Sequence, residues 1–145
     1  MWLLLSPTRL EAPFLQGEPF AFLAWRGLKG PGFVYLETGI GKVNAAMALA
    51  AYAARNPVEK ALLFGLAGAY PGGPSLGEAV LVEEEVEADL GLKEGLAPLG
   101  FPALALGDRR YFNRVPLDPG RTGELARGLG LKVAVGLTRD LVSET

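Results

Sequence analysis

The stretch from Phe33 to Gly65 constrains the fold most, because it reads as strand, helix and strand in succession. Phe33–Leu36 is a short apolar run typical of a strand. The alanine-rich segment Lys42–Arg55 follows, and alanine is the strongest helix former. Asn56-Pro57 ends that helix, since the residue before a proline avoids helical backbone. Lys60–Phe64 is then a continuous apolar run bounded by glycine, as a buried parallel strand is. We therefore expect an α/β fold built around a βαβ unit.

Shorter patterns predict further elements on both sides of this unit. Additional strands are expected over Trp2–Leu5, Phe20–Trp25, Ala79–Val82 and Lys132–Leu137. Turn residues fill Gly27–Gly32, so the apolar runs before and after it suggest a hairpin. Short helices are expected over Arg9–Leu15, which contains Pro13, and over Pro119–Gly128, with Asp118 as its N-cap.

Three segments carry expectations about exposure. Few polar residues interrupt Lys42–Arg55, so sheet or another subunit should cover most of that helix. The acidic run Glu83–Glu87 would extend a strand along a solvated edge. Gly91–Pro116 is rich in proline and reads as irregular, and Asp89 just before it reads as a turn residue.

The length and the end of the chain bear on its organisation. The chain has 145 residues, which is the size of one domain. We therefore expect residues 1–145 to form a single but incomplete α/β domain. Lys132–Leu137 is followed by too few residues for a covering helix, whereas a parallel sheet normally has both faces covered. This pattern favours a chain that is cut short or completed by a partner, and an exposed tail is the alternative.

Composition excludes several classes of function. The chain has no cysteine and no histidine, which removes thiolate and imidazole nucleophiles, bases and metal ligands. With 14 basic and 16 acidic residues it lacks the positive charge that nucleic acids or anionic membranes attract. Met1–Leu5 is apolar but too short for a membrane helix, and it lacks the basic region of a signal peptide. We expect a cytoplasmic protein with no cofactor, no metal site, and no nucleic-acid or membrane partner.

Two glycine-rich segments follow expected strands. Gly39-Ile40-Gly41-Lys42 opens the helix, and helix N-termini bind anions. Neither the dinucleotide fingerprint nor the P-loop pattern is met, because Asn44 and Val43 replace required residues. A tight strand-to-helix turn explains this segment equally well. Gly65–Ala69 lies at the carboxyl end of its strand, where open α/β sheets bind ligands, although a plain tight loop would look the same.

Glu11 follows the first expected strand, so its carboxylate could face the same crevice or simply be solvated.

Taken in order, four blocks of sequence resemble the superfamily of nucleoside phosphorylases and nucleosidases. These blocks are Thr38–Ala46, Phe64–Ala69, Ser75–Val82 and Ala88–Gly91. The resemblance is strong from Thr38 to Gly91, extends less distinctly to residues 1–15, and holds only in outline after Leu92. Methylthioadenosine/S-adenosylhomocysteine nucleosidases share the first three blocks and carry a different aspartate-containing segment at the fourth. The resemblance implies a mixed central sheet flanked by helices, in a three-layer sandwich.

The resemblance also implies a reaction, the cleavage of the N-ribosidic bond of a purine nucleoside. Glu11 would then activate the attacking water. The substrate would be bound by Pro7, Thr8, Ile40, Ala67, Gly68, Val142 and Ser143. Pro7 and Thr8 would lie on the ribosyl side, Ile40 on the 5′ side, and Ala67 and Gly68 beside the sugar. Members of the superfamily usually form homodimers, so a homo-oligomer is expected.

Hydrolysis is favoured over phosphorolysis by two positions. Phosphorylases of this superfamily carry an arginine and a hydroxyl residue where this chain has Leu63 and Leu66. Neither leucine can donate to a phosphate dianion. The superfamily's ribose-binding Met-Glu motif and its leaving-group aspartate would come after Leu141, and Asp140 precedes that aspartate in order.

Two other classes stay open. The chain could be a scaffold of this superfamily that lost catalysis and acts as an oligomer or binding module. It could also be an ordinary nucleotide-binding α/β domain.

Overall fold

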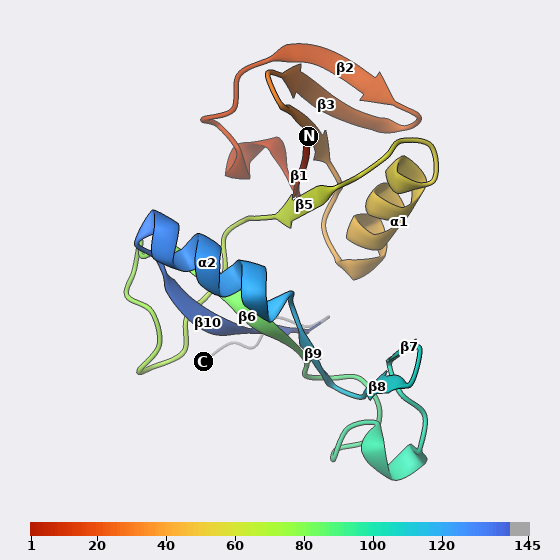
Figure 1. The fold of residues 1–145 in the computed structure, drawn as a ribbon. Helices are drawn as coiled ribbons and strands as arrows, with labels where there is room; N and C mark the ends of the chain where they lie inside the picture. Colours follow the sequence, from red (N-terminus) through yellow and green to blue (C-terminus); the bar gives the residue numbers. More distant parts are fainter. Residues whose placement is uncertain (140–145) are drawn as a thin grey trace. The chain divides into compact units, whose positions relative to one another are not determined.

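A computed structural model describes residues 1–139 of the chain, and these fall into two compact units. The first unit is Met1–Gly68, and the second comprises the described residues from Ala69 onward. Figure 1 shows each unit with its own sheet and its own helix. The single-domain organisation expected from the length stays a prediction.

The first unit is built on a five-stranded sheet with the order β2-β3-β4-β1-β5. Its strands are β1 (Trp2–Ser6), β2 (Glu18–Phe22), β3 (Trp25–Gly30), β4 (Phe33–Glu37) and β5 (Lys60–Leu63). β1 lies between β4 and β5 and is parallel to both. β3 is antiparallel to β2 and β4, so the sheet is mixed.

The expected βαβ unit is present. Helix α1 (Lys42–Ala53) connects β4 to β5, as Figure 1 shows. β1 occupies the place between those two strands, in register Leu3↔Val34 on one side and Leu3↔Ala61 on the other.

The core of the first unit lies between the sheet and α1. Its buried residues are Leu3, Leu5, Val34, Leu36 and Tyr52. The four aliphatic residues come from β1 and β4 at every second position, as expected for strands with one buried face. Tyr52 of α1 meets the Phe22 ring edge-on at a centroid distance of 5.0 Å, which links the helix to the hairpin formed by β2 and β3.

Helix α1 is less covered than expected. Only Ala48 and Tyr52 of the helix are buried, while Val43 and Met47 are 72% and 50% exposed. The sheet therefore covers one narrow side of the helix. Coverage of the rest by another subunit stays a prediction.

The prediction of a turn over Gly27–Gly32 is wrong for most of that segment. Trp25–Gly30 forms β3, and only Pro31 and Gly32 turn, with Gly32 at φ +76°. Gly27 serves close strand packing instead, because a Cβ there would collide with the carbonyl of Tyr35 on β4. The helix expected over Arg9–Leu15 is also shorter, a single 3-10 turn η1 over Arg9–Glu11.

The second unit contains a three-stranded sheet with the order β10-β6-β9. Its elements are β6 (Val80–Glu87), η2 (Ala97–Leu99), β7 (Leu104–Leu106), β8 (Arg109–Tyr111), β9 (Arg114–Pro116), α2 (Pro119–Leu129) and β10 (Lys132–Thr138). β10 is parallel to β6, and α2 packs on both strands. The Asp118 carboxylate accepts from the Arg121 N–H at 3.4 Å, so the predicted cap is present.

The acidic run does not form a solvated edge. Glu83–Glu87 belongs to β6, which is the central strand of this sheet. Glu84 pairs with Arg114 of β9 at 2.5 Å, and Glu85 accepts a hydrogen bond from the Thr138 hydroxyl of β10. Partners on both neighbouring strands therefore replace the solvent that the sequence pattern suggested.

Leu36 provides a test of the first core. It is fully buried, so Leu36→Ala should lower the free energy of unfolding by about 2–5 kcal/mol through lost packing and a residual cavity. Leu10→Ala is the matched control, because Leu10 is 88% exposed and its loss should change stability by about 0.5 kcal/mol or less. Urea denaturation of the two variants measures both values, and equal losses would contradict the assignment of this core.

Candidate active site

Three strand ends meet at one edge of the first sheet. Because β4, β1 and β5 run parallel, the residues that follow them emerge on the same side. The pairing continues past the strands: Thr38 N–H donates to the Ser6 carbonyl at 2.9 Å, and Phe64 N–H donates to the Leu5 carbonyl at 3.0 Å. Candidate site residues on three distant segments are thereby brought together.

Glu11 is held at this edge by both oxygens of its carboxylate. Oε2 accepts hydrogen bonds from the Thr8 backbone N–H at 3.1 Å and the Thr8 hydroxyl at 3.0 Å. Oε1 accepts from the Leu66 backbone N–H at 3.0 Å, across 55 positions of sequence. The Thr8 contacts form a capping box on η1, and the Leu66 contact ties that turn to the segment after β5.

These hydrogen bonds set the charge of the site. The Leu66 N–H lowers the pKa of the Glu11 carboxyl below its ordinary value, and both Thr8 donors lower it further, against an opposing effect of burial. Glu11 is therefore a carboxylate near neutral pH, an acceptor that can take a proton rather than supply one. The ionised form is the one that a general base requires.

Gly65 makes room for this carboxylate. A Cβ at Gly65 would lie 2.7 Å from Glu11 Oε1, closer than such atoms approach, and 3.4 Å from the ring of Pro7. A Cβ at Gly68 would meet no atom within 4 Å. Of the two glycines, only Gly65 is required for the carboxylate to reach the Leu66 N–H.

The other predicted site residues lie as follows. Pro7 and Thr8 are part of the Glu11 cluster, with the Pro7 carbonyl accepting from Gly39 N–H at 2.9 Å. Ala67 and Gly68 are exposed just beyond Leu66. Ile40 is 77% exposed between two glycines of positive φ, in the turn before α1.

Val142 and Ser143 lie outside the described residues. The roles of all these residues in substrate binding stay predictions.

The structure adds one functional group that the sequence did not reveal, the backbone N–H of Leu66. A backbone donor leaves no residue pattern, since any residue except proline carries it. The glycine immediately before it was the available signal.

Among residues 1–139, no cluster of acidic side chains could hold a metal ion. Within the same range, no helix is long and apolar enough to cross a membrane.

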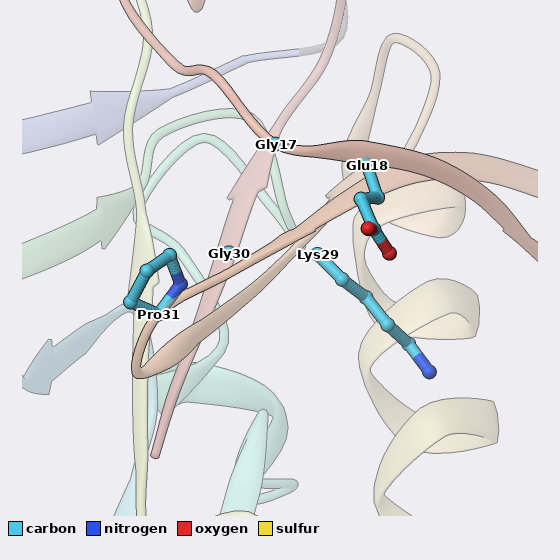
Figure 2. A pocket seen from close by; sticks show the side chains of 5 residues that line it. All are labelled: Gly17, Glu18, Lys29, Gly30 and Pro31. Carbon is cyan, nitrogen blue, oxygen red and sulfur yellow. The ribbon is translucent and has the colours of Figure 1, made fainter.

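A surface hollow elsewhere on the first unit is distinct from this site. It has a volume of about 430 Å³ and is lined by Gly17, Glu18, Lys29, Gly30 and Pro31. Figure 2 shows the side chains of Glu18 on β2 and Lys29 on β3, two paired strands that line the hollow. None of its lining residues contacts Glu11, and we assign it no role in catalysis.

The fold has close counterparts among solved structures. It is the fold of nucleosidases: an S-adenosylhomocysteine nucleosidase from Streptococcus pyogenes, in complex with 5-methylthiotubericidin, superposes with a TM-score of 0.74 at 16% identity, covering 97% of this chain and 63% of that one. A futalosine hydrolase mutant of Helicobacter pylori superposes with a TM-score of 0.71 at 17% identity, covering 99% of this chain and 70% of that one. The expected nucleoside phosphorylase-like α/β fold is confirmed.

Sequence similarity narrows the class. All 145 residues match a futalosine hydrolase from Thermus thermophilus at 97% identity, and the chain spans 64% of that relative's length. No protein-family model matches the chain. The resemblance to the superfamily of nucleoside phosphorylases and nucleosidases is thus confirmed.

Gly65→Ala tests the geometry of the carboxylate. The added methyl group should push Oε1 off the Leu66 N–H with little loss of stability, because the displaced atom ends a flexible side chain. In an NMR titration, the Leu66 amide should lose its response to Glu11 ionisation, and the pKa of Glu11 should rise towards its ordinary value. Gly68→Ala is the control and should leave both signals as in the parent; the same change in both variants would contradict the arrangement.

The depressed pKa of Glu11 also predicts how stability depends on pH. Its hydrogen bonds favour the ionised form in the folded state, so their contribution is present above the unfolded-state pKa and is lost as pH falls through the folded-state pKa. The stability difference between the parent chain and Glu11→Gln should therefore shrink on acidification. Urea denaturation at a series of pH values measures this, and a constant difference would refute it.

Proposed function

We propose that this chain carries the water-activating part of a nucleoside hydrolase that cleaves the N-ribosidic bond of futalosine. The products are hypoxanthine and dehypoxanthine futalosine, and the reaction is a step of menaquinone biosynthesis. The observation that carries the proposal is the ionised Glu11 carboxylate, anchored to Leu66 at the strand ends of a nucleosidase fold. The 97% identity to a futalosine hydrolase supports the choice of substrate.

Glu11 has the free acceptor capacity that a base needs. Each carboxylate oxygen has about two lone-pair sites, and among the described residues Oε1 accepts only the hydrogen bond from the Leu66 N–H. The remaining site can accept a hydrogen bond from water. As the water oxygen bonds to the anomeric carbon, its proton passes to Glu11, the carbon–nitrogen bond breaks, and the electron pair leaves with the purine, which takes up a proton.

Water is favoured over phosphate as the nucleophile. Leu63 and Leu66, at the positions of the phosphorylase arginine and hydroxyl, are 57% and 87% exposed and offer no side-chain donor. Arg9 is the nearby cation on η1, and its Nη2 is engaged by the Leu15 carbonyl at 2.7 Å. The side chains at positions 63 and 66 therefore offer a phosphate dianion no charge-assisted donor.

We assign the substrate contacts as the resemblance implies them. Pro7, Thr8, Ile40, Ala67 and Gly68 would line the sugar side. Val142 and Ser143 would begin the base-binding segment.

We also propose that the protein is a homo-oligomer, because the apolar side chains of Val43 and Met47 on α1 are exposed. A cytoplasmic location belongs to the same proposal.

A second substrate is supported by one observation. Among proteins of the same fold, the nucleosidase from Neisseria meningitidis is described in complex with methylthio-immucillin-A, with a TM-score of 0.69 and 21% identity over 94% of this chain and 62% of that one. Methylthioadenosine and S-adenosylhomocysteine are therefore the competing substrates. A non-catalytic binding module would bind a nucleoside without turnover.

The decisive experiment measures hypoxanthine release from futalosine, by this chain and by this chain joined to the remaining residues of the Thermus relative. We expect release by the joined protein without phosphate, and no acceleration on adding it. Glu11→Gln should reduce turnover by about 10²–10⁴-fold, since a positioned base contributes that much.

Controls separate the alternatives. A higher kcat/KM for adenine release from methylthioadenosine than for hypoxanthine release from futalosine would identify methylthioadenosine as the preferred substrate. Dependence on phosphate would refute hydrolysis. Binding without turnover in the joined protein would favour the binding module. Glu18→Gln removes an exposed carboxylate remote from these contacts and should leave turnover unchanged.

A further inference from the structure

The turn that presents Glu11 is held at three consecutive residues, Pro7, Thr8 and Arg9, by groups at the ends of strands β1 and β4. Gly39 N–H, just past β4, donates to the Pro7 carbonyl at 2.9 Å. The Thr8 carbonyl accepts from the Ser6 hydroxyl at 2.9 Å. The Arg9 backbone N–H donates to Glu37 Oε2 at 2.8 Å. The peptide unit between Thr8 and Arg9 is therefore fixed at both its carbonyl and its N–H.

A buried hydroxyl chain lies behind the carbonyl contact. Ser6 Oγ and the Tyr35 hydroxyl are 2.8 Å apart, and both residues are fully buried. The single Ser6 hydroxyl hydrogen goes to the Thr8 carbonyl, so Tyr35 must be the donor to Ser6. Burial raises the pKa of the Tyr35 phenol, which keeps that proton in place. Hydrogen bonds in such a chain polarise one another and strengthen the link.

Tyr35 and Glu37 act from the same face of β4. They are two positions apart, so their side chains project to the same side of the strand. One reaches the Thr8–Arg9 peptide through Ser6, and the other binds it directly.

We propose that Glu37 and Tyr35 are positioning residues for Glu11: they fix the Thr8–Arg9 peptide, and through Thr8 they fix the carboxylate against the Leu66 N–H. The connection is short, because the Thr8 N–H and hydroxyl are the two donors to Glu11 Oε2. A shift of the turn would move the carboxylate and loosen its bond to Leu66. A catalytic effect of Glu37 and Tyr35 rests on the proposed function. Their positioning of the Glu11 carboxylate does not depend on it.

Charge and hydrogen bonding must be separated in the test. The charged or titratable groups around the turn are Glu11, Arg9, Glu37 and Tyr35. Loss of a neighbouring like charge by itself lowers the pKa of a carboxyl, so both variants compared must lack the Glu37 charge. Glu37→Gln and Glu37→Ala both remove that charge, but only the glutamine keeps an oxygen that can accept from the Arg9 N–H.

The experiment titrates Glu11 by NMR in the chain and follows the Leu66 amide resonance. In Glu37→Ala we expect a higher Glu11 pKa than in Glu37→Gln, and a Leu66 amide that responds less to the titration. Tyr35→Phe keeps the ring volume and removes the donor to Ser6, and it should shift the Glu11 pKa in the same upward direction. Glu18→Ala and Glu18→Gln form the matched control pair on β2 and should titrate identically at Glu11.

Equal titrations in Glu37→Ala and Glu37→Gln, with no change in Tyr35→Phe, would overturn the proposal. In the joined protein, Glu37→Ala should lower kcat by about tenfold or more relative to Glu37→Gln, as small misplacements of a reacting group do. A joined parent protein without hydrolase activity would refute the proposed function and leave the titration result to decide the positioning role.

Discussion

The parallel pairing of β1 with both β4 and β5 is the constraint on which the rest of the first unit depends. It brings three strand ends to one edge, so that residues 7–11, 38–40 and 64–68 become neighbours. An antiparallel partner at either side would send one of these segments to the opposite edge. The hydrogen bond between Glu11 and the Leu66 N–H, which spans 55 positions, follows from that pairing. The ionised state of the carboxylate follows in turn from that hydrogen bond.

Much of this arrangement could be predicted from the sequence because it rests on local signals. The helix over Lys42–Ala53 and the strands on either side follow from alanine content, Asn56-Pro57 and continuous apolar runs. The position of Glu11 near Gly65 follows from the rule that ligands bind at carboxyl ends of parallel strands. The Leu66 donor could not be predicted, since it belongs to the backbone.

The errors share one physical cause, which is that tertiary contacts override the usual meaning of a residue type. Gly27 looks like a turn residue, yet it lies inside β3. A glycine is needed there because the Tyr35 carbonyl leaves no room for a side chain. Glu84 and Glu85 look solvated, yet Arg114 and Thr138 on neighbouring strands bind them. In each case the deciding partner lies on a neighbouring strand of the sheet.

Within residues 1–139, the groups that hold the Glu11 carboxylate all lie in the first 66 residues: Thr8, Leu66, and the Tyr35–Ser6 and Glu37 contacts behind them. These residues all belong to the unit Met1–Gly68. The position of the proposed base therefore depends on the assembly of β1, β4 and β5, and none of the contacts that fix it among residues 1–139 reaches beyond Gly68.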